Sequence, residues 1–535
     1  MTAVQHDTYT PEEVLSLYRE HDGTLHDMVA GRAEAAPDRT MLIDRERSWT
    51  WAEATACAAR LAGRLRDLGV GRGDRVALVA PNSGWHVLAL LAVSRLGAVL
   101  VPLNPEMRGE ELSYPLTKAD PTVVLTTAEL VETVSAAVPE EAAPVIRSLG
   151  EELWDADPLE ENLGRPEDGS VIIFTSGTTG YPKGAVHSQR TLLLSGESFV
   201  SRVRLQPHDR CLTILPLFHI NAMFYSVVGA LTAGAALILE PRFSASRFWS
   251  VVREHGVTQT NMIEAVGAIL LKRADDTFTP DTTLRKIYGI RQALSGPFRE
   301  RFGVPHLVGG YGMTEIPGVL ATPYDGPTSP GSMGRLAPHP GHGAPLAECR
   351  IVDDGRDVPD GEVGELWVRT PTVMIEYFRD PEQTASSFEG DWFRTGDLVR
   401  RDAEGWFYFV AREKDIIRCR GENISGAELD RVVSSHPDVV VAAAIGVPSD
   451  LGDEDILVAL TAREGSVPTA EEITDHVRRS LGEIKVPRYV YITEQLPLTS
   501  TGKVAKHVLK QDASLVQAAT DTRADTEASA PARNR

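Results

Sequence analysis

The sequence predicts an α/β protein whose large N-terminal part consists of doubly wound sheets and a β-rich subdomain, followed by a small α+β C-terminal domain. The chain has 535 residues, 42% of them hydrophobic, which is enough for two or more domains with large cores. Helical and strand periodicities alternate along its first half, which is typical of a mostly parallel sheet with helices on both faces. Beyond about Cys349, short apolar runs separated by Gly and Asp turns indicate a β-rich segment.

The alternation begins near Trp51. Residues 51–69 carry apolar side chains at helical spacing and end in a glycine, and residues 75–80 have the composition of a strand. Residues 85–97 and 98–103 repeat this cycle. A second series of strands is predicted at residues 171–174, 211–217, 235–240 and 257–263. Ligand sites in such sheets lie at the carboxyl ends of the strands.

The last third of the chain has a different pattern of apolar residues and turns. Short strands are predicted at residues 349–354, 364–370 and 405–410. Beyond Arg412 we expect helices at residues 426–436 and 470–482 and strands at residues 439–446, 456–462 and 488–493. The predicted domains are residues 1–411 and 412–512, and residues 513–535, which are poor in apolar side chains, are predicted to form a disordered tail.

Composition excludes several classes of partner. Lysine and arginine total 54 against 75 aspartates and glutamates, a net charge of −21, so phosphate backbones and anionic membranes would repel the surface. Nucleic acid is therefore not an expected partner. Four dispersed cysteines fit neither a CxxC pair nor a disulfide framework and favour a reducing, cytoplasmic compartment. No secretion signal is evident, and no apolar run approaches the roughly 18 residues of a spanning helix.

The stretch IIFTSGTTGYPKGAVHS, residues 172–188, joins a hydrophobic strand to a loop rich in glycine and hydroxyl groups. Such a loop exposes backbone N–H groups that, together with hydroxyls and the ammonium of Lys183, can hold a polyphosphate. It is not the P-loop pattern GxxxxGK[ST], because Lys183 precedes Gly184 and Ala185 follows it, so a Walker-type ATPase is disfavoured. Taken alone, a loop of this kind is more often a plain surface connector.

Four further segments accompany this loop in a fixed order. They are YGMTE at residues 311–315, WFRTGDL at 392–398, REKDIIRCRGENIS at 412–425 and PLTSTGKVAKHVLK at 497–510. Together the five segments resemble the acyl-adenylate-forming enzymes, which include acyl-CoA synthetases, luciferases and peptide-synthetase adenylation domains. The short connection between Leu294–Gly296 and the YGMTE segment is most similar to the carnitine and crotonobetaine CoA ligases.

The resemblance implies an AMP-forming acid:CoA ligase. A carboxylic acid would react with ATP to give an acyl adenylate and pyrophosphate, and coenzyme A would then displace AMP. ATP, Mg²⁺ and coenzyme A are the implied cofactors. The resemblance also implies that the small C-terminal domain is mobile and rotates about a hinge near Lys414 between the two steps.

The resemblance assigns a binding role to many positions. The implied cofactor-binding residues are Thr175, Ser176, Gly177, Thr178, Thr179, Gly180, Lys183, Tyr311, Gly312, Thr314, Asp397, Arg412 and Gly421. Glu315 would be the Mg²⁺ ligand, because this hard cation takes oxygen ligands and few carboxylates, and Thr314 would bind phosphate. Asp397 and Arg412 would contact the ribose, and Tyr311 would stack on adenine. Each of these residues also has a structural alternative, as a turn, cap, packing or surface-pair residue.

The implied catalytic residues are Lys503, Glu315, Thr175 and His219. Lys503 would enter the site only for adenylation and bridge carboxylate and phosphate oxygens. In the other orientation Gly421 would let the pantetheine thiol pass close to the backbone. His219 would lie near the thiol channel, although a histidine between Phe218 and Ile220 is equally well explained as a core residue.

The acid substrate and the acceptor stay open at the level of sequence. Glu264 falls where related enzymes line the acyl pocket, and a buried carboxylate there would suit a cationic substrate. The simpler reading is that Glu264 faces solvent at the start of a helix. The acceptor could be a carrier protein acting in trans or another nucleophile instead of coenzyme A, and a non-enzymatic nucleotide-binding regulator is a third reading. A homodimer is compatible with the family.

Overall fold

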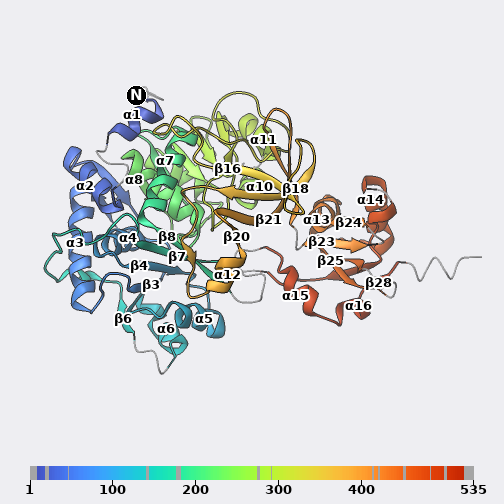
Figure 1. Ribbon diagram of the computed structural model, residues 1–535, viewed down its shortest axis with the longest axis horizontal. Coiled ribbons are helices and arrows are strands. Elements are labelled where there is room, and N and C mark those ends of the chain that lie inside the picture. The colour runs from blue at the N-terminus through green and yellow to red at the C-terminus, as the bar shows by residue number, and fades with distance from the viewer. Residues whose placement is uncertain are drawn as a thin grey trace, which may run out of the picture. The chain divides into compact units, whose positions relative to one another are not determined.

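The computed structural model of the protein describes residues 9–17, 23–45, 47–139, 144–175, 182–273, 278–290, 292–412, 415–419, 422–449, 454–481, 483–498 and 503–522 (Figure 1). Contacts divide these residues into two compact units. The first unit contains the described residues up to 175, 182–349 and 368–393. The second unit contains 350–367 and the described residues from 394 onward.

A seven-stranded sheet in the first unit has the strand order β19-β8-β7-β4-β3-β5-β6. Its strands are β3 Arg75–Val79, β4 Val99–Leu103, β5 Val123–Thr126, β6 Val145–Ser148, β7 Gly169–Thr175, β8 Lys183–Ser188 and β19 Glu376–Tyr377. The strands from β7 to β6 along this order run parallel, whereas β8 is antiparallel to β7 and β19 is antiparallel to β8. The predicted parallel sheet is therefore extended at one side by an antiparallel hairpin and a two-residue strand.

Helices cover both faces of this sheet, as predicted. The helices are α3 Trp51–Asp67, α4 Gly84–Leu96, α5 Gly109–Ala119 and α6 Val131–Ala137, with α3 and α4 on one face and α5 and α6 on the other (Figure 1). Alternate residues of β3 divide between the two cores: Val76 and Leu78 pack with α3 and α4, and Ala77 and Val79 pack with α5 and α6. This division is the two-residue period of a strand buried on both sides.

A second seven-stranded sheet in the same unit has the order β13-β12-β11-β9-β10-β1-β2. Its strands are β1 Thr40–Ile43, β2 Ser48–Thr50, β9 Arg210–Thr213, β10 Ala236–Leu239, β11 Gln259–Asn261, β12 Lys286–Tyr288 and β13 His306–Val308. All neighbours are parallel except β2, which is antiparallel to β1. The accompanying helices are α1 Pro11–Ser16, α2 Leu25–Ala35, α7 Gln189–Val203, a π-helix Asn221–Val228, α8 Gly229–Ala233, α9 Phe248–His255, α10 Glu264–Arg273 and α11 Gln292–Phe302. Helix α12 Pro381–Ser386 instead packs against β19 of the first sheet. A small hairpin pairs β14 Gly310–Tyr311 with β15 Leu320–Ala321.

The predicted β-rich segment is a separate sheet. Its order is β17-β16-β18-β21-β20, with β22 paired to β21. The strands are β16 Glu348–Asp353, β17 Arg356–Asp357, β18 Val363–Arg369, β20 Phe388–Glu389, β21 Trp392–Arg401 and β22 Phe407–Arg412.

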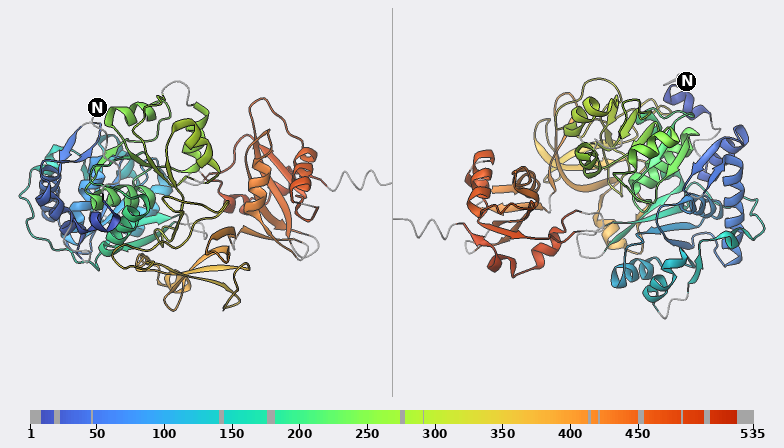
Figure 2. Two further views of the ribbon diagram at one scale, coloured as in Figure 1. Left: turned by 90° about the horizontal axis from the view of Figure 1, so that it is seen from above. Right: turned by 180° about the vertical axis from the view of Figure 1, so that it is seen from behind.

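The C-terminal part of the second unit is an α+β fold, as predicted. Its elements are β23 Ile416–Cys419, β24 Glu422–Ser425, α13 Gly426–Ser434, β25 Val439–Pro448, β26 Glu454–Ala462, α14 Ala470–Leu481, β27 Tyr489–Thr493, α15 Lys506–Gln511, α16 Leu515–Ala518 and β28 Thr520–Asp521. The sheet β25-β26-β27-β28 carries α13 and α14 on one face and α15 and α16 on the other (Figures 1 and 2).

Residues 513–522, which were predicted to belong to a disordered tail, are ordered in the structure. Residues 513–522 contain α16 and β28, Leu515 is buried, and Asp521 forms an ion pair with Arg488 at 3.2 Å. One buried leucine and a short strand pairing suffice to fix a segment of otherwise polar composition. Residues 523–535 lie outside the described residues.

A search of the described helices for a segment of sufficient length and hydropathy to span a bilayer finds none.

Candidate active site

The hydroxyl-rich loop is framed by the hairpin of β7 and β8. Thr175 ends β7, Lys183 begins β8, and the two residues lie opposite each other in the antiparallel register. Both are partly buried. The expected phosphate-binding residues Ser176, Gly177, Thr178, Thr179 and Gly180 lie outside the described residues, so the hairpin fixes where the loop starts and ends.

Lys183 lies against an aromatic ring from a distant part of the chain. Its Nζ is 5.2 Å from the ring centroid of Tyr377, which belongs to β19. Strand β19 pairs with β8 so that Tyr377 lies opposite Ala185, two residues beyond Lys183. The strand pairing thus brings Tyr377 beside the lysine of the loop, a cation–π arrangement.

Glu315 is held by the same tyrosine. The Tyr377 hydroxyl donates a hydrogen bond of 2.7 Å to Glu315 Oε1, and both side chains are buried. Burial, and secondarily the negative charge of Glu315, raises the pKa of Tyr377, so the hydroxyl keeps its proton and acts as a donor. The backbone N–H of Met374 donates to the Glu315 carbonyl at 2.8 Å. Lys183 and Glu315, expected from separate motifs, therefore share one neighbour.

Thr314 is fixed from the other side by a buried histidine. His187 Nε2 lies 2.7 Å from the Thr314 carbonyl oxygen, and the imidazole is fully buried, edge-on to Phe224 at 5.0 Å. Burial lowers the pKa of His187 to about 4, so at neutral pH the ring is uncharged and donates from Nε2.

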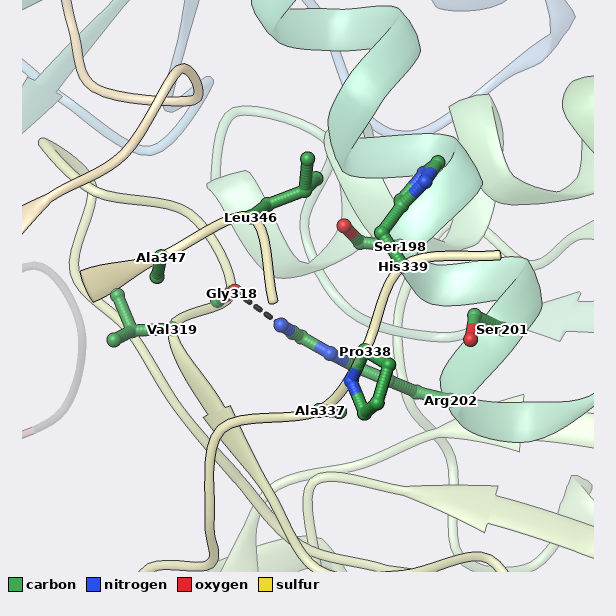
Figure 3. A pocket seen from close by; sticks show the side chains of 10 residues that line it. All are labelled: Ser198, Ser201, Arg202, Gly318, Val319, Ala337, Pro338, His339, Leu346 and Ala347. Carbon is green, nitrogen blue, oxygen red and sulfur yellow. Dashed lines mark hydrogen bonds between the residues drawn. The ribbon is translucent and has the colours of Figure 1, made fainter. Parts of the chain in front are cut away.

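The loop between β14 and β15, residues 312–319, carries Thr314 and Glu315. Its two ends approach closely, since a Cβ on Gly312 would lie 2.6 Å from the Gly318 backbone nitrogen. Gly318 has a φ of +62°, and the Arg202 guanidinium donates to its carbonyl oxygen (Figure 3). Tyr311 precedes this loop and pairs with Leu320 across the hairpin. The loop is thus closed at its base and clamped by α7.

A small pocket lies beside this clamp. Arg202 of α7 points to Gly318, and Ser198 and Ser201 of the same helix also line the pocket (Figure 3). The remaining lining residues are Val319, Ala337, Pro338, His339, Leu346 and Ala347. His339 Nε2 is 3.1 Å from Glu197 Oε2, and both side chains are almost completely buried. The pocket adjoins the loop that carries Glu315 but contains none of the predicted site residues.

Asp397 and Arg412 form a pair in the second unit. They lie opposite each other in the antiparallel pairing of β21 and β22, and Arg412 Nε is 2.7 Å from Asp397 Oδ1. The Asp397 side chain is 2% exposed, whereas that of Arg412 is 49% exposed. The pair therefore presents an arginine fork to solvent above a buried carboxylate, a donor and acceptor set that suits a diol.

The segment before Asp397 is fixed by a buried glutamate that was not predicted. Glu365 Oε1 accepts from the Gly396 backbone N–H at 3.0 Å, and Glu365 Oε2 accepts from Trp367 Nε1 at 2.8 Å. The Asp397 N–H donates to Thr395 Oγ1 at 3.0 Å. These bonds hold the short TGD sequence in place.

The other predicted residues are more exposed or lie outside the described residues. Lys503 is exposed on the second unit. His219 is partly buried in the turn before the π-helix, with its ring 4.6 Å from that of Phe218, which leaves both of its readings open. Glu264 is exposed as the first residue of α10, so the solvent-facing reading holds and the buried-carboxylate reading is not supported. Gly421 and the hinge residue Lys414 lie outside the described residues.

The residues around Glu315 fit a magnesium ion. No group of three or more Asp, Glu, His or Cys side chains capable of holding a metal occurs in the described part of the chain. A single buried carboxylate next to a threonine suits Mg²⁺, which takes one or two protein carboxylates and completes its shell with water and phosphate oxygens.

Comparison with known proteins identifies the family. The AMP-binding enzyme family matches residues 29–378, and the AMP-binding enzyme C-terminal domain matches residues 428–503. The chain belongs to the AMP-binding enzyme family, and the predicted resemblance to acyl-adenylate-forming enzymes is confirmed.

Relatives of known name extend over almost the whole chain. An oxalate–CoA ligase of Arabidopsis thaliana is 31% identical over 515 residues, covering 91% of this chain and 98% of the relative. A crotonobetaine/carnitine–CoA ligase of Escherichia fergusonii is 30% identical over 477 residues, covering 84% and 91%. The crystal structure of ATP-bound MatB from Rhodopseudomonas palustris matches with a TM-score of 0.81 at 26% identity, covering 91% of this chain and 98% of that one. The predicted fold class is confirmed.

Proposed function

We propose that the protein is an ATP-dependent acid:CoA ligase that forms an acyl-CoA thioester through an acyl adenylate and releases pyrophosphate and AMP. The observation that carries the proposal is the junction of Lys183, Tyr377 and Glu315. The lysine that follows the glycine-rich loop lies over the ring of Tyr377, and the candidate metal ligand accepts a hydrogen bond from its hydroxyl, which supports a triphosphate site here.

In the first step an oxygen of the acid attacks the α-phosphorus of ATP, and the bond to the β-phosphate breaks. The N–H and hydroxyl groups of the loop from Thr175 to Gly180 and the ammonium of Lys183 would bind the phosphates. Glu315 would hold Mg²⁺ with Thr314 nearby, and this ion supplies charge neutralisation on the phosphate oxygens. Lys503 would bring a further positive charge to the two reacting anions.

In the second step the thiol sulfur of coenzyme A attacks the acyl carbon, and AMP leaves with the bonding electrons. Asp397 and Arg412 would hold the ribose in both steps, and Tyr311 would stack on adenine. The proposal includes domains at residues 1–411 and 412–512, a hinge near Lys414 and passage of the thiol beside Gly421 and His219. The scattered cysteines support a cytoplasmic enzyme, and a homodimer is compatible with it.

The acid is the open part of the proposal. The relatives are named for acids as unlike as oxalate and crotonobetaine or carnitine, and the exposed Glu264 gives no support to a cationic substrate.

A second candidate function keeps adenylation but passes the acyl group to a carrier protein or another nucleophile. The presence of Lys503, Glu315 and Asp397 argues against a regulator that only binds nucleotide.

The experiment is pyrophosphate release measured over a panel of carboxylic acids, with and without coenzyme A. We expect one class of acid to release about one pyrophosphate per enzyme without coenzyme A and to give many turnovers of pyrophosphate release when coenzyme A is added. A single turnover that coenzyme A leaves unchanged would favour another acceptor. Nucleotide binding without acid-dependent release for any acid would contradict the ligase.

A further inference from the structure

We infer that Tyr377 is a positioning residue for the metal and phosphate site: its hydroxyl aims the Glu315 carboxylate at the cation, and its ring holds the Lys183 ammonium. This inference rests on the proposed function, since it assigns Glu315 to Mg²⁺ and Lys183 to phosphate.

The backbone around Tyr377 is tied on both sides. Ile375 N–H donates to the Val186 carbonyl and Phe378 N–H donates to the Gly184 carbonyl, each at 2.7 Å. The Tyr377 N–H itself donates to Thr384 Oγ1 at 2.9 Å. A residue held in this way cannot shift along β8, so its side chain is a fixed reference for its neighbours.

Glu315 receives two bonds from this segment. Met374 N–H binds its backbone carbonyl at 2.8 Å, and the Tyr377 hydroxyl binds Oε1 at 2.7 Å. Within the described residues no hydrogen bond is made to Oε2. Because a glutamate has several rotatable bonds, a donor on one carboxylate oxygen sets the direction in which the other points. The geometry therefore leaves Oε2 as the oxygen that would bind a cation.

The ring of Tyr377 has a separate role, which is to contact the Lys183 ammonium. Lys183 Nζ lies 5.2 Å from its centroid, and the lysine follows directly on the glycine-rich loop. A flexible ammonium gains a preferred place from an aromatic face. One side chain thus sets the spacing between the group that would hold the cation and the group that would meet the phosphates.

The test separates hydroxyl from ring by two substitutions. Tyr377→Phe removes the hydroxyl and keeps the ring, and Tyr377→Leu removes both. Mn²⁺ binding is followed by electron paramagnetic resonance in the full-length protein with the nonhydrolysable analogue β,γ-methylene ATP. Binding of the analogue itself is measured by calorimetry.

We expect Tyr377→Phe to weaken Mn²⁺ binding about tenfold, the effect of losing a hydrogen bond to a charged group, with little change in analogue binding in the absence of metal. Tyr377→Leu should weaken both. Unchanged Mn²⁺ affinity in Tyr377→Phe overturns the role of the hydroxyl, and unchanged metal-free analogue affinity in Tyr377→Leu overturns the role of the ring.

Tyr408→Phe is the matched control, because the Tyr408 hydroxyl also donates to a carboxylate, Asp402 Oδ2, at 2.7 Å. It should leave Mn²⁺ and analogue binding as in the wild type. A loss equal to that of Tyr377→Phe would contradict a specific role. Acid-dependent pyrophosphate release by the wild type is measured separately, so failure of the ligase proposal is distinguished from failure of this one.

Discussion

At the scale of single residues, the site depends on side chains that are buried and polar. His187 supports the backbone of Thr314, Tyr377 supports Glu315, and Glu365 supports Gly396. A buried polar group without a partner is unfavourable, so each of these contacts fixes a short stretch of backbone or a carboxylate.

His187 makes stability depend on pH. Its pKa is about 4 in the folded protein and near 6.5 in the unfolded chain, so below pH 6.5 the unfolded chain takes up a proton that the folded protein does not. The contribution of the neutral His187 to the free energy of unfolding is therefore fully present above pH 6.5 and is lost as the pH falls toward 4. At pH 5 the loss from this residue is about 2 kcal/mol. Urea unfolding should show that the free energy of unfolding falls by about 2 kcal/mol less in His187→Gln than in the wild type between pH 7 and pH 5.

The exposed His342 provides the control for this measurement. His342→Gln should lose as much stability as the wild type between the two pH values. An equal loss in His187→Gln and the wild type would show that this imidazole is not the group that takes up the proton.

The sequence motifs predicted candidate residues for the chemistry, but they gave no prediction of the residues that support those candidates. Glu315, Asp397 and Arg412 lie in short motifs that can be recognised one at a time. Tyr377 and His187 have no such signal, because the side chain of each contacts a residue more than fifty positions away in the sequence. The register that places Tyr377 opposite Ala185 appears only in the folded sheet.

At the scale of elements, the hairpin loop of residues 312–319 depends on Gly318. An L residue is strained at its φ of +62°, and a Cβ there would overlap the Arg202 guanidinium. We expect Gly318→Ala to destabilise the protein by about 1–2 kcal/mol through strain and by a further ~1 kcal/mol because the Arg202 guanidinium must move and loses its hydrogen bond to the Gly318 carbonyl. It should also raise the KM for Mg·ATP, because the same loop carries Glu315.

Gly303→Ala is the comparison for this prediction. Gly303 has a φ of +67°, and a Cβ added at this position would have no neighbouring atom within 4 Å. The substitution should show only the strain part in urea unfolding and leave the KM for Mg·ATP unchanged. Equal effects of the two substitutions would mean that the Arg202 clamp contributes nothing.

Helices and strands were predictable where their periodicity was long. The helix at residues 51–69 and the strands at residues 439–446 and 456–462 were predicted because burial imposes a regular spacing of apolar side chains. The antiparallel pairing of β7 with β8 was not predicted, because the same apolar run fits a parallel neighbour equally well. Two-residue strands such as β19 carry no periodicity at all.

At the scale of the whole molecule, the proposed reaction uses residues from both compact units. Thr175, Lys183 and Glu315 belong to the first unit, and Asp397, Arg412 and Lys503 belong to the second. The two steps of this reaction can be separated by substituting a residue that is needed for only one step.

Lys503→Ala is that substitution. We expect acid-dependent exchange of labelled pyrophosphate into ATP to fall by about 10²–10³-fold, because a charge that stabilises the transition state is lost. Thioester formation from supplied acyl adenylate and coenzyme A should persist. Lys510→Ala, which removes another exposed lysine of the same segment, should leave both reactions intact. Undiminished exchange in Lys503→Ala would show that another group assists adenylation.

The short pairing of β28 with β27 has a practical consequence for protein production. Strand β27 contains tyrosine, valine and isoleucine side chains, and β28 covers the edge that it would otherwise present to other chains. Truncation before residue 513 would uncover that edge and remove the Asp521 partner of Arg488, inviting intermolecular strand pairing and aggregation during purification. A C-terminal affinity tag or shortened expression boundary is therefore best placed after Thr522.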